Sequence, residues 1–279
     1  MPYDSRTGRA LDVLVSLADP DQGERVRARI GLDGPPGPVV PDEWTALREF
    51  FTVPMPLSGR LWMLEEDEPL RNRLVHLSGG LPAALRLALL NGEPFGPGRG
   101  ESVPRMTELL VAEEPEGSPA LSPQELIPAL RAVATMRRGR RIARWIPRDA
   151  WQRVIDADDE QPLPGYARWA LALRPDCPAV LRERLSGHPS YAHRMRAAGL
   201  FDNPGTYAAT ARPARTALAV LDMGRWAFPR RIPEAEEVLR PLVRGSLGAD
   251  TEAWAALAQR LPTFTGTVPE LITTAGATA

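Results

Sequence analysis

The sequence predicts an all-α fold of stacked antiparallel helical pairs, an arrangement known as an α-solenoid. Apolar residues recur at helical spacing along most of the chain, whereas the period-2 alternation of β-branched residues that marks strands is nearly absent. A phrase of thirteen residues at 77–89 also returns at 173–185 with six identical positions. Because recurring phrases mark repeat architectures, we expect units that bury their apolar faces against their neighbours.

The first 95 residues are expected to form an N-terminal helical repeat region. Asp42 is a suitable N-cap for a helix that continues through Phe51. Pro20 interrupts the helical pattern before it, and residues 52–62 interrupt the pattern after it. The segments with helical spacing are 9–31, 44–51, 67–78 and 82–91.

The stretch 96–122 is the best candidate for a domain boundary, because it is rich in Gly, Pro and Glu. We expect a linker here, followed by a C-terminal helical repeat domain over 123–279. Ser122 and Pro123 open that domain with a capping residue and a proline at the first helical position. Residues 201–231 are expected to be an irregular insertion with one short helix near 213–222. The segments with helical spacing are 123–136, 148–156, 165–173, 178–186, 188–199, 233–245, 250–260 and 267–275.

The repeated phrase has a physical basis. Pro178 fixes φ in a first helical turn, where its missing N–H costs nothing. Leucines one turn apart then face the neighbouring helix. Arg182 and Arg86 each follow such a leucine, and we expect their stems to cover the edge of the core while their charges reach solvent. The leucines that we expect to be buried are Leu85, Leu89, Leu181 and Leu185.

The stretch 165–199 resembles the variant leucine-rich repeat, a relative of HEAT-type α-solenoids. In that family a turn of the type (H/R)PD-x-P starts one helix, and (D/H)P-x-x-x-VR-x-A starts the next. Residues 70–95 and 11–31 match more loosely. The resemblance implies an α-solenoid and says nothing of a ligand. Met195 stands where the family usually has Val, and the matching positions are Pro175, Asp176, Pro178, Leu181, Leu185, His188, Pro189, Arg196 and Ala197.

Composition excludes several classes of enzyme. The chain contains no lysine, so all 34 basic residues are arginine. P-loop NTPases, pyridoxal phosphate enzymes and protein kinases each need a lysine. The single cysteine, Cys177, rules out both an internal disulfide and the cysteine cluster with which some variant leucine-rich repeat proteins bind iron and sulfur.

Neither a bilayer-spanning segment nor a secretory signal is evident. No apolar run approaches the ~18 residues that a transmembrane helix needs. The N-terminal stretch lacks the long apolar core of a signal peptide. We therefore expect a cytoplasmic protein that has no contact with membranes. We also expect that it needs no cofactor.

The most distinctive chemical feature is the segment 131–148, which holds seven arginines, one tryptophan and no acidic residue. Guanidinium groups match the geometry of phosphate, and the tryptophan ring could stack on a base. HEAT-like alkylpurine DNA glycosylases are helical solenoids that bind DNA on a basic concave face. The alternative is a solvated helix face, or docking on the acidic residues of 156–160. On one continuous helix the shared face would contain Arg137, Arg140, Arg141, Arg144 and Arg148, with Trp145 beside them.

A second group of basic and aromatic residues lies within the expected insertion: Arg225, Trp226, Arg230 and Arg231. Arginine beside tryptophan is the composition of binding hot spots in protein interfaces. The alternative interpretation is that these residues belong to a loop that packs onto the solenoid.

Other candidate sites are weaker. The four acidic residues at 65–68 could bind a divalent cation or a basic partner, although such a run is more typical of a solvated helix N-terminus. His188 and His193 are five residues apart, which does not match the i, i+4 spacing of a helical metal pair. Cys177 is interpreted as a small apolar filler rather than a nucleophile.

These observations leave three hypotheses for function. The first is a non-enzymatic binding protein that presents a helical-repeat surface to a protein partner. The second is an α-solenoid that binds nucleic acid through the segment 131–148. The third is an enzyme of unrecognised type, for which no catalytic group can be nominated. A continuous basic face would favour nucleic acid, whereas arginines paired with acidic residues would favour a protein partner.

Overall fold

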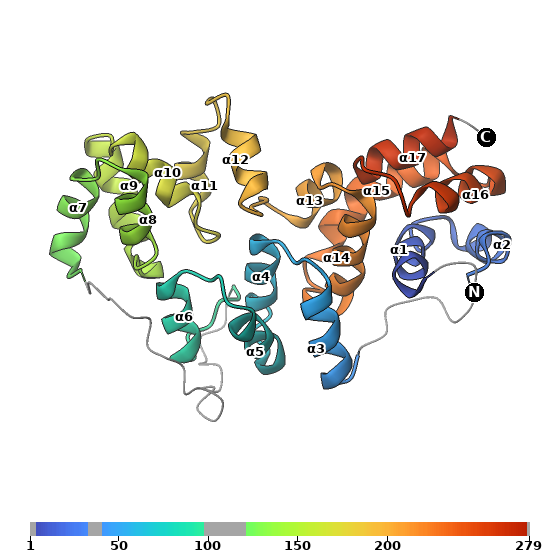
Figure 1. Ribbon diagram of the computed structural model, residues 1–279, viewed down its shortest axis with the longest axis horizontal. Coiled ribbons are helices and arrows are strands. Elements are labelled where there is room, and N and C mark those ends of the chain that lie inside the picture. Colours follow the sequence, from blue (N-terminus) through green and yellow to red (C-terminus); the bar gives the residue numbers. More distant parts are fainter. Residues whose placement is uncertain (1–3, 33–40, 98–120, 278–279) are drawn as a thin grey trace. The chain divides into compact units, whose positions relative to one another are not determined.

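The computed structural model describes residues 4–32, 41–97 and 121–277. In these ranges the chain forms seventeen α-helices and one short 3₁₀ helix and contains no strand (Figure 1). The all-α prediction is therefore confirmed. Most of the expected linker, residues 98–120, lies outside the described residues.

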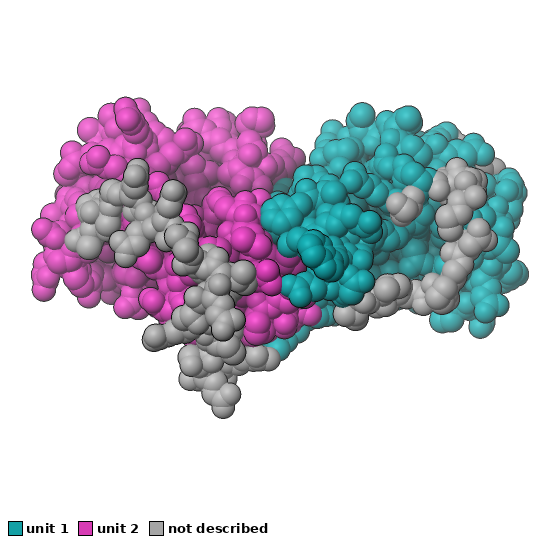
Figure 2. All heavy atoms as spheres, turned by 60° about the horizontal axis from the view of Figure 1, so that its bottom comes forward, with its two compact units in different colours: residues 1–55, 201–279 teal, residues 56–200 magenta. Residues whose placement is uncertain are grey.

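The chain forms two compact units (Figure 2). Unit 1 comprises residues 1–55 and 201–279, and unit 2 comprises residues 56–200. The boundaries between the units therefore lie between residues 55 and 56 and between residues 200 and 201, and not in the expected linker at 96–122. Ser58 holds the two ends of unit 2 together, because its backbone N–H and its hydroxyl both donate to the carbonyl of Gly199, at 3.1 and 3.2 Å. Such a pairing of distant residues leaves no trace in local composition.

Unit 1 is built from helices of both chain segments. Within it α1 packs on α14, α2 on α16, α13 on α15, and α15 on α17. The helices are α1 (Ser5–Val15), α2 (Pro20–Ile30), α3 (Glu43–Thr52), α13 (Pro204–Thr210), α14 (Ala214–Ala227), α15 (Ile232–Ser246), α16 (Thr251–Arg260) and α17 (Val268–Gly276).

The expectation of an irregular insertion at 201–231 is wrong, although the short helix expected near 213–222 is part of α14. Helices α13 and α14 occupy most of this stretch, and α14 buries nine of its residues. Pro204 stands at the first turn of α13, where Asn203 accepts a hydrogen bond from Thr206 N at 2.7 Å, and Pro213 is the N-cap of α14. The prolines therefore mark where helices begin, a position that suits their fixed φ.

Unit 2 contains the repeated phrase and the arginine-rich segment. Its main apolar core is formed by α7 to α11, and a smaller cluster around Trp169 joins α10 to α12. The helices are α4 (Leu57–Leu64), α5 (Pro69–Ser78), α6 (Ala83–Leu90), α7 (Pro123–Arg131), α8 (Met136–Ala143), η1 (Arg148–Ala150), α9 (Trp151–Glu160), α10 (Gly165–Ala172), α11 (Ala179–Glu183) and α12 (Tyr191–Ala197).

The leucines of the repeated phrase are buried as expected, and none of Leu85, Leu89, Leu181 and Leu185 is more than 8% exposed. Arg182 differs from the expectation, because it is itself buried and does not reach solvent. Its Nη2 donates to the carbonyls of Arg174 and Pro175, at 2.7 and 2.8 Å. The guanidinium thus binds two carbonyls of the turn between α10 and α11.

Arg174 connects four elements of unit 2. Its Nε and Nη2 donate to the two carboxylate oxygens of Asp176, at 2.8 and 2.6 Å. Its Nη1 donates to the carbonyls of Ala143 and Ile146 at the end of α8. Asp176 also accepts a hydrogen bond from Trp151 Nε1 in α9, at 3.0 Å. The turn between α10 and α11 is therefore tied to both α8 and α9.

In unit 1, Asp222 of α14 is a carboxylate enclosed by charged groups. It lies 3.6 Å from Arg9 Nε and 4.0 Å from Arg225 Nη1. Burial raises the pKa of Asp222 to about 6, and the two arginines oppose that rise. Folding therefore stabilises the protonated form of Asp222.

The packing of α11 predicts different costs for two adjacent substitutions. Leu181→Ala should lower the free energy of unfolding by about 2–5 kcal/mol, because the removed methyl groups leave a cavity in the core. Val180→Ala is the matched control: it should change that energy by less than about 0.5 kcal/mol, since Val180 is 41% exposed. Denaturant unfolding measures both. Equal effects would show that the buried face of α11 is misassigned.

Asp222→Asn should change how stability depends on pH. The folded-state pKa of about 6 lies above the unfolded-state value of about 3.8, so Asp222 contributes most stability below pH 3.8 and that contribution is lost as pH rises to 6. In the Asn variant this loss of stability with rising pH is absent. Arg225 and Arg9 keep Asp12 and Glu49 as partners. Thermal melts across that range should show a smaller downward trend in the variant, whereas parallel curves would contradict the assignment.

Candidate functional site

The arginine-rich segment forms a short helix with one buried side. Thr135 caps α8 by accepting a hydrogen bond from Arg138 N, at 3.3 Å. Ile142 and Ala143 point into the core, so the arginines of the helix stay exposed. Buried apolar residues at helical spacing thus fix which side of α8 carries the charge.

Gly139 lets α8 approach α10 closely. A Cβ atom at this position would lie 2.8 Å from the carbonyl oxygen of Tyr166 and 3.0 Å from Cβ of Ala170. The helices pack against each other at this point. A glycine in mid-helix costs about 1 kcal/mol relative to alanine, and the close approach explains why it is found here.

A groove of about 1030 Å³ opens beside this helix pair. Residues of α8, α10 and α12 line it, together with residues of α6 and at the start of α4. None of the described residues that line the groove is acidic. Its basic residues are Arg86, Arg140, Arg144, Arg174, His193 and Arg194.

Four of the five arginines in the groove have no carboxylate within ion-pair distance among the described residues. Arg140 of α8 and Arg144, the C-cap of that helix, are exposed. Arg194 lies 4.6 Å above the ring of Trp169, which fixes its place without neutralising its charge. Arg86 is half-buried, and its Nε finds no hydrogen-bond partner in the described part of the chain. Only Arg174 is paired within the protein, with Asp176.

A backbone hydrogen bond brings the two walls of the groove together. Ala84 N, at the N-terminus of α6, donates to the carbonyl of Arg144 at 3.0 Å. Arg86 lies two residues after Ala84 in α6 and lines the same groove as Arg144. Burial and the positive charge of Arg86 lower the pKa of His76, which keeps that buried imidazole neutral at physiological pH.

The structure divides the predicted arginine face. Arg140 and Arg144 line the groove, whereas Arg137 and Arg141 are exposed on α8 but do not line it. Arg148 lies beyond the helix, where it donates to the carbonyl of Pro94 at 2.7 Å and stacks on Phe95 at 4.3 Å. The expectation of one shared face is wrong, because α8 ends at Ala143.

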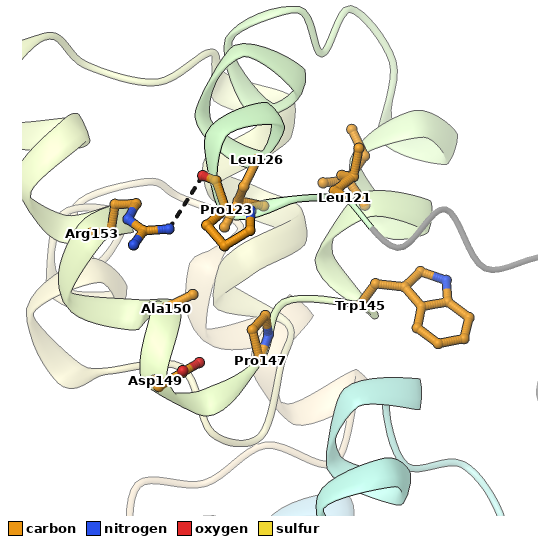
Figure 3. A pocket seen from close by; sticks show the side chains of 9 residues that line it. Leu121, Pro123, Leu126, Trp145, Pro147, Asp149, Ala150 and Arg153 are labelled. Atoms are coloured by element: carbon orange, nitrogen blue, oxygen red, sulfur yellow. Dashed lines mark hydrogen bonds between the residues drawn. The ribbon is translucent and has the colours of Figure 1, made fainter.

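Trp145 does not line the groove. It is half-buried and lies at one side of a small pocket of about 110 Å³, with its ring directed away from Arg153 (Figure 3). Arg153 closes the opposite side by donating to the carbonyl of Pro123 at 3.2 Å (Figure 3). The expectation that Trp145 and the arginines form one site is therefore not met.

The second predicted group belongs to unit 1 and has largely internal contacts. Arg225 donates to Asp12 at 3.0 Å, and Trp226 is 7% exposed. Arg231 pairs with Glu234 at 2.8 Å, while Arg230 is exposed. Among these four described residues Arg230 alone is classed as exposed, so they do not form the exposed hot spot that the sequence suggested.

The acidic run at 65–68 leads into a helix N-terminus as expected, but it is solvated only in part, because Glu66 and Asp67 are buried. Asp67 is buried with φ of 53°, and its carboxylate accepts hydrogen bonds from Phe95 N and Gly96 N, at 2.7 and 2.9 Å. Glu68 caps α5 by accepting from Leu70 N and Arg71 N. In the described residues no group of three His, Cys, Asp or Glu side chains is placed to hold a metal ion.

The remaining reactive side chains have structural surroundings. Burial raises the pKa of the Cys177 thiol to about 12, so the thiol stays protonated and is a poor nucleophile. His188 packs edge-on against Trp169 and accepts a hydrogen bond from Ser190 N. Cys177 and His188 therefore have structural roles in packing.

Three groove residues were missed by sequence reasoning: Tyr166, His193 and Arg194. Each lies on a predicted helix, but nothing in the sequence separates them from other exposed residues. Arg86 was noticed only as part of the repeated phrase. The repeated phrase has arginine at this position in both copies, Arg86 and Arg182. The two side chains nevertheless differ in environment, because Arg182 is buried and Arg86 lines a groove.

No protein family, curated protein or solved structure was found that matches this chain. Across the described ranges, no helix combines the length and apolar character needed to cross a bilayer.

Gly139→Ala should destabilise unit 2 even though alanine favours helices. The added Cβ meets backbone, so α8 must move away from α10, at a cost of about 1–3 kcal/mol. Gly165→Ala is the control in the same unit, because a Cβ added there would meet no neighbouring atom within 4 Å. Denaturant melts should show a loss for the first variant and no loss for the second. A stable Gly139→Ala protein would disprove the close approach.

Proposed function

We propose that this protein is a non-enzymatic, helical-repeat protein that binds nucleic acid through the groove of unit 2. One observation carries the proposal: four arginines face a groove in which the described residues supply neither an ion-pair partner for them nor an acidic wall. Arginines gathered in this way produce a positive potential that attracts an anion from outside the protein.

Phosphate is the anion that best fits this arrangement. A guanidinium group donates two parallel hydrogen bonds to phosphate oxygens, and its charge does not depend on pH in the physiological range. Arg140 and Arg144 lie one helical turn apart on the same side of α8, while Arg86 and Arg194 come from two other helices. A ligand with several phosphates in a row can contact more than one of them.

The packing order of the helices supports the repeat interpretation. Helix α8 packs on α10, α13 on α15, and α15 on α17, so that elements two places apart stack on each other. The Arg174–Asp176 turn lies where the resemblance to the variant leucine-rich repeat is best. We extend the proposal to a cytoplasmic location, on the basis of the single, buried Cys177.

The test compares two pairs of arginines on the same helix. Arg140→Gln with Arg144→Gln removes two charges from the groove, and Arg137→Gln with Arg141→Gln removes two exposed charges beside it. Glutamine is nearly as good a helix former as arginine, so both variants should keep the wild-type melting temperature. Binding to a labelled oligonucleotide is titrated at several salt concentrations.

We expect the groove pair to weaken binding and to flatten the log–log salt dependence by about 1.4 to 1.8, which corresponds to the loss of two phosphate contacts. The control pair should leave the slope almost unchanged. Equal effects of the two pairs would show that the charge of α8 acts without the groove. Absence of binding by the wild-type chain at low salt would refute the proposal.

A protein partner is the second candidate, because unit 1 exposes two large aromatic side chains. Trp44 is 80% and Phe51 is 55% exposed, and they lie two turns apart on one side of α3. Replacing both by serine should leave the melting temperature unchanged. If this face binds a protein, the variant should lose a partner that the wild-type chain retains from its native cell, and identical retention by both would count against it.

A further inference from the structure

The groove of unit 2 combines charge with apolar surface. Tyr166 on α10 lines it and is 55% exposed, a large fraction for an aromatic ring inside a groove. Met136, Leu173 and Ala170 contribute further apolar surface to the same lining. A ligand that fills this groove must therefore offer apolar faces as well as negative charges.

This combination favours one form of nucleic acid. In a duplex the faces of the bases are stacked inside, so the surface offers phosphates and narrow base edges. In a single strand the bases can be unstacked, and each has a π-face that packs on an aromatic side chain. An exposed tyrosine surrounded by apolar groups can therefore stack on a base of a single strand but not on a base of a duplex.

We infer that the groove binds single-stranded nucleic acid, with Tyr166 as a stacking platform for a base and Arg86, Arg140, Arg144 and Arg194 as contacts to the phosphates. This inference rests on the proposed function and adds the form of the ligand. Arg140 lies on α8 next to Gly139, at the point where that helix packs on Tyr166. The close contact of α8 with α10 thus accompanies a phosphate-binding cation and a stacking ring that line the same groove.

The position of Arg194 supports the same division of roles. Its guanidinium lies over Trp169, a ring that is only 7% exposed and belongs to the core. Trp169 therefore orients a cation but cannot itself stack on a base. Tyr166 is the one Phe, Tyr or Trp side chain among the described lining residues of the groove, which makes it the group to test.

The experiment measures the affinity of the full chain for three probes. They are a labelled single strand of about ten nucleotides, within the ~4–16 that single-strand sites commonly cover, the duplex of the same sequence, and inorganic polyphosphate, which has charge but no bases. Tyr166→Ala removes the ring and Tyr166→Phe keeps it. Trp44→Ala is the control, because it removes an exposed aromatic side chain of unit 1.

We expect the wild-type chain to bind the single strand more tightly than the duplex or polyphosphate. Tyr166→Ala should weaken binding of the single strand about 5- to 100-fold, the range for loss of one stacked base. It should leave the affinity for polyphosphate unchanged. Tyr166→Phe and Trp44→Ala should both bind the single strand like the wild type.

Two results would overturn the inference in different ways. If duplex or polyphosphate binds as tightly as the single strand and Tyr166→Ala has no effect, the groove binds anions without stacking, and the proposed function survives while this inference fails. If none of the three probes binds at low salt, the proposed function itself fails. A preserved circular dichroism spectrum shows that Tyr166→Ala still folds, as its exposure leads us to expect.

Discussion

The organisation of unit 2 depends on the buried guanidinium of Arg174. This side chain is 3% exposed, and it satisfies Asp176 and two carbonyls at the end of α8 at the same time. Removing one partner of a buried ion pair typically costs about 3–5 kcal/mol, because the other charge stays buried without compensation. The end of α8, the turn before α11 and the contact to Trp151 of α9 are therefore fixed together. The arginines of α8 take their positions from this fixed end.

Two roles of arginine stand out in unit 2, and because the chain has no lysine the same side chain serves both. Arg174 and Arg182 are buried and bind backbone carbonyls, a role that suits a planar group with several donors in fixed directions. Arg140 and Arg144 are exposed and lie in a groove without acidic residues. The same side chain thus builds the scaffold in one place and leaves positive charge available in another. Burial and hydrogen bonds to backbone carbonyls separate the two roles.

Local sequence patterns were sufficient to predict the helices of the repeated phrase. Leu181 and Leu185 are buried because their spacing matches one helical turn, and that spacing is visible in the sequence. Helix α13 was missed and α14 was expected only as a short helix near 213–222, because Pro204 and Pro213 look like interruptions, although both stand where helices begin. The groove could not be predicted from the sequence. It depends on the hydrogen bond from Ala84 to Arg144, which joins residues far apart in the sequence, and no periodicity indicates that Arg86 and Arg144 share one cavity.

Ultraviolet crosslinking of a single-stranded oligonucleotide to the intact chain, with the modified peptides identified by mass spectrometry, tests most directly whether unit 2 binds nucleic acid in its groove. We expect crosslinks at Tyr166 and at residues of α8 and α12 that line the groove. The crosslinks should disappear when unlabelled single strand competes. Crosslinks confined to unit 1, or to the exposed side of α8 around Arg137 and Arg141, would contradict a binding site in the groove.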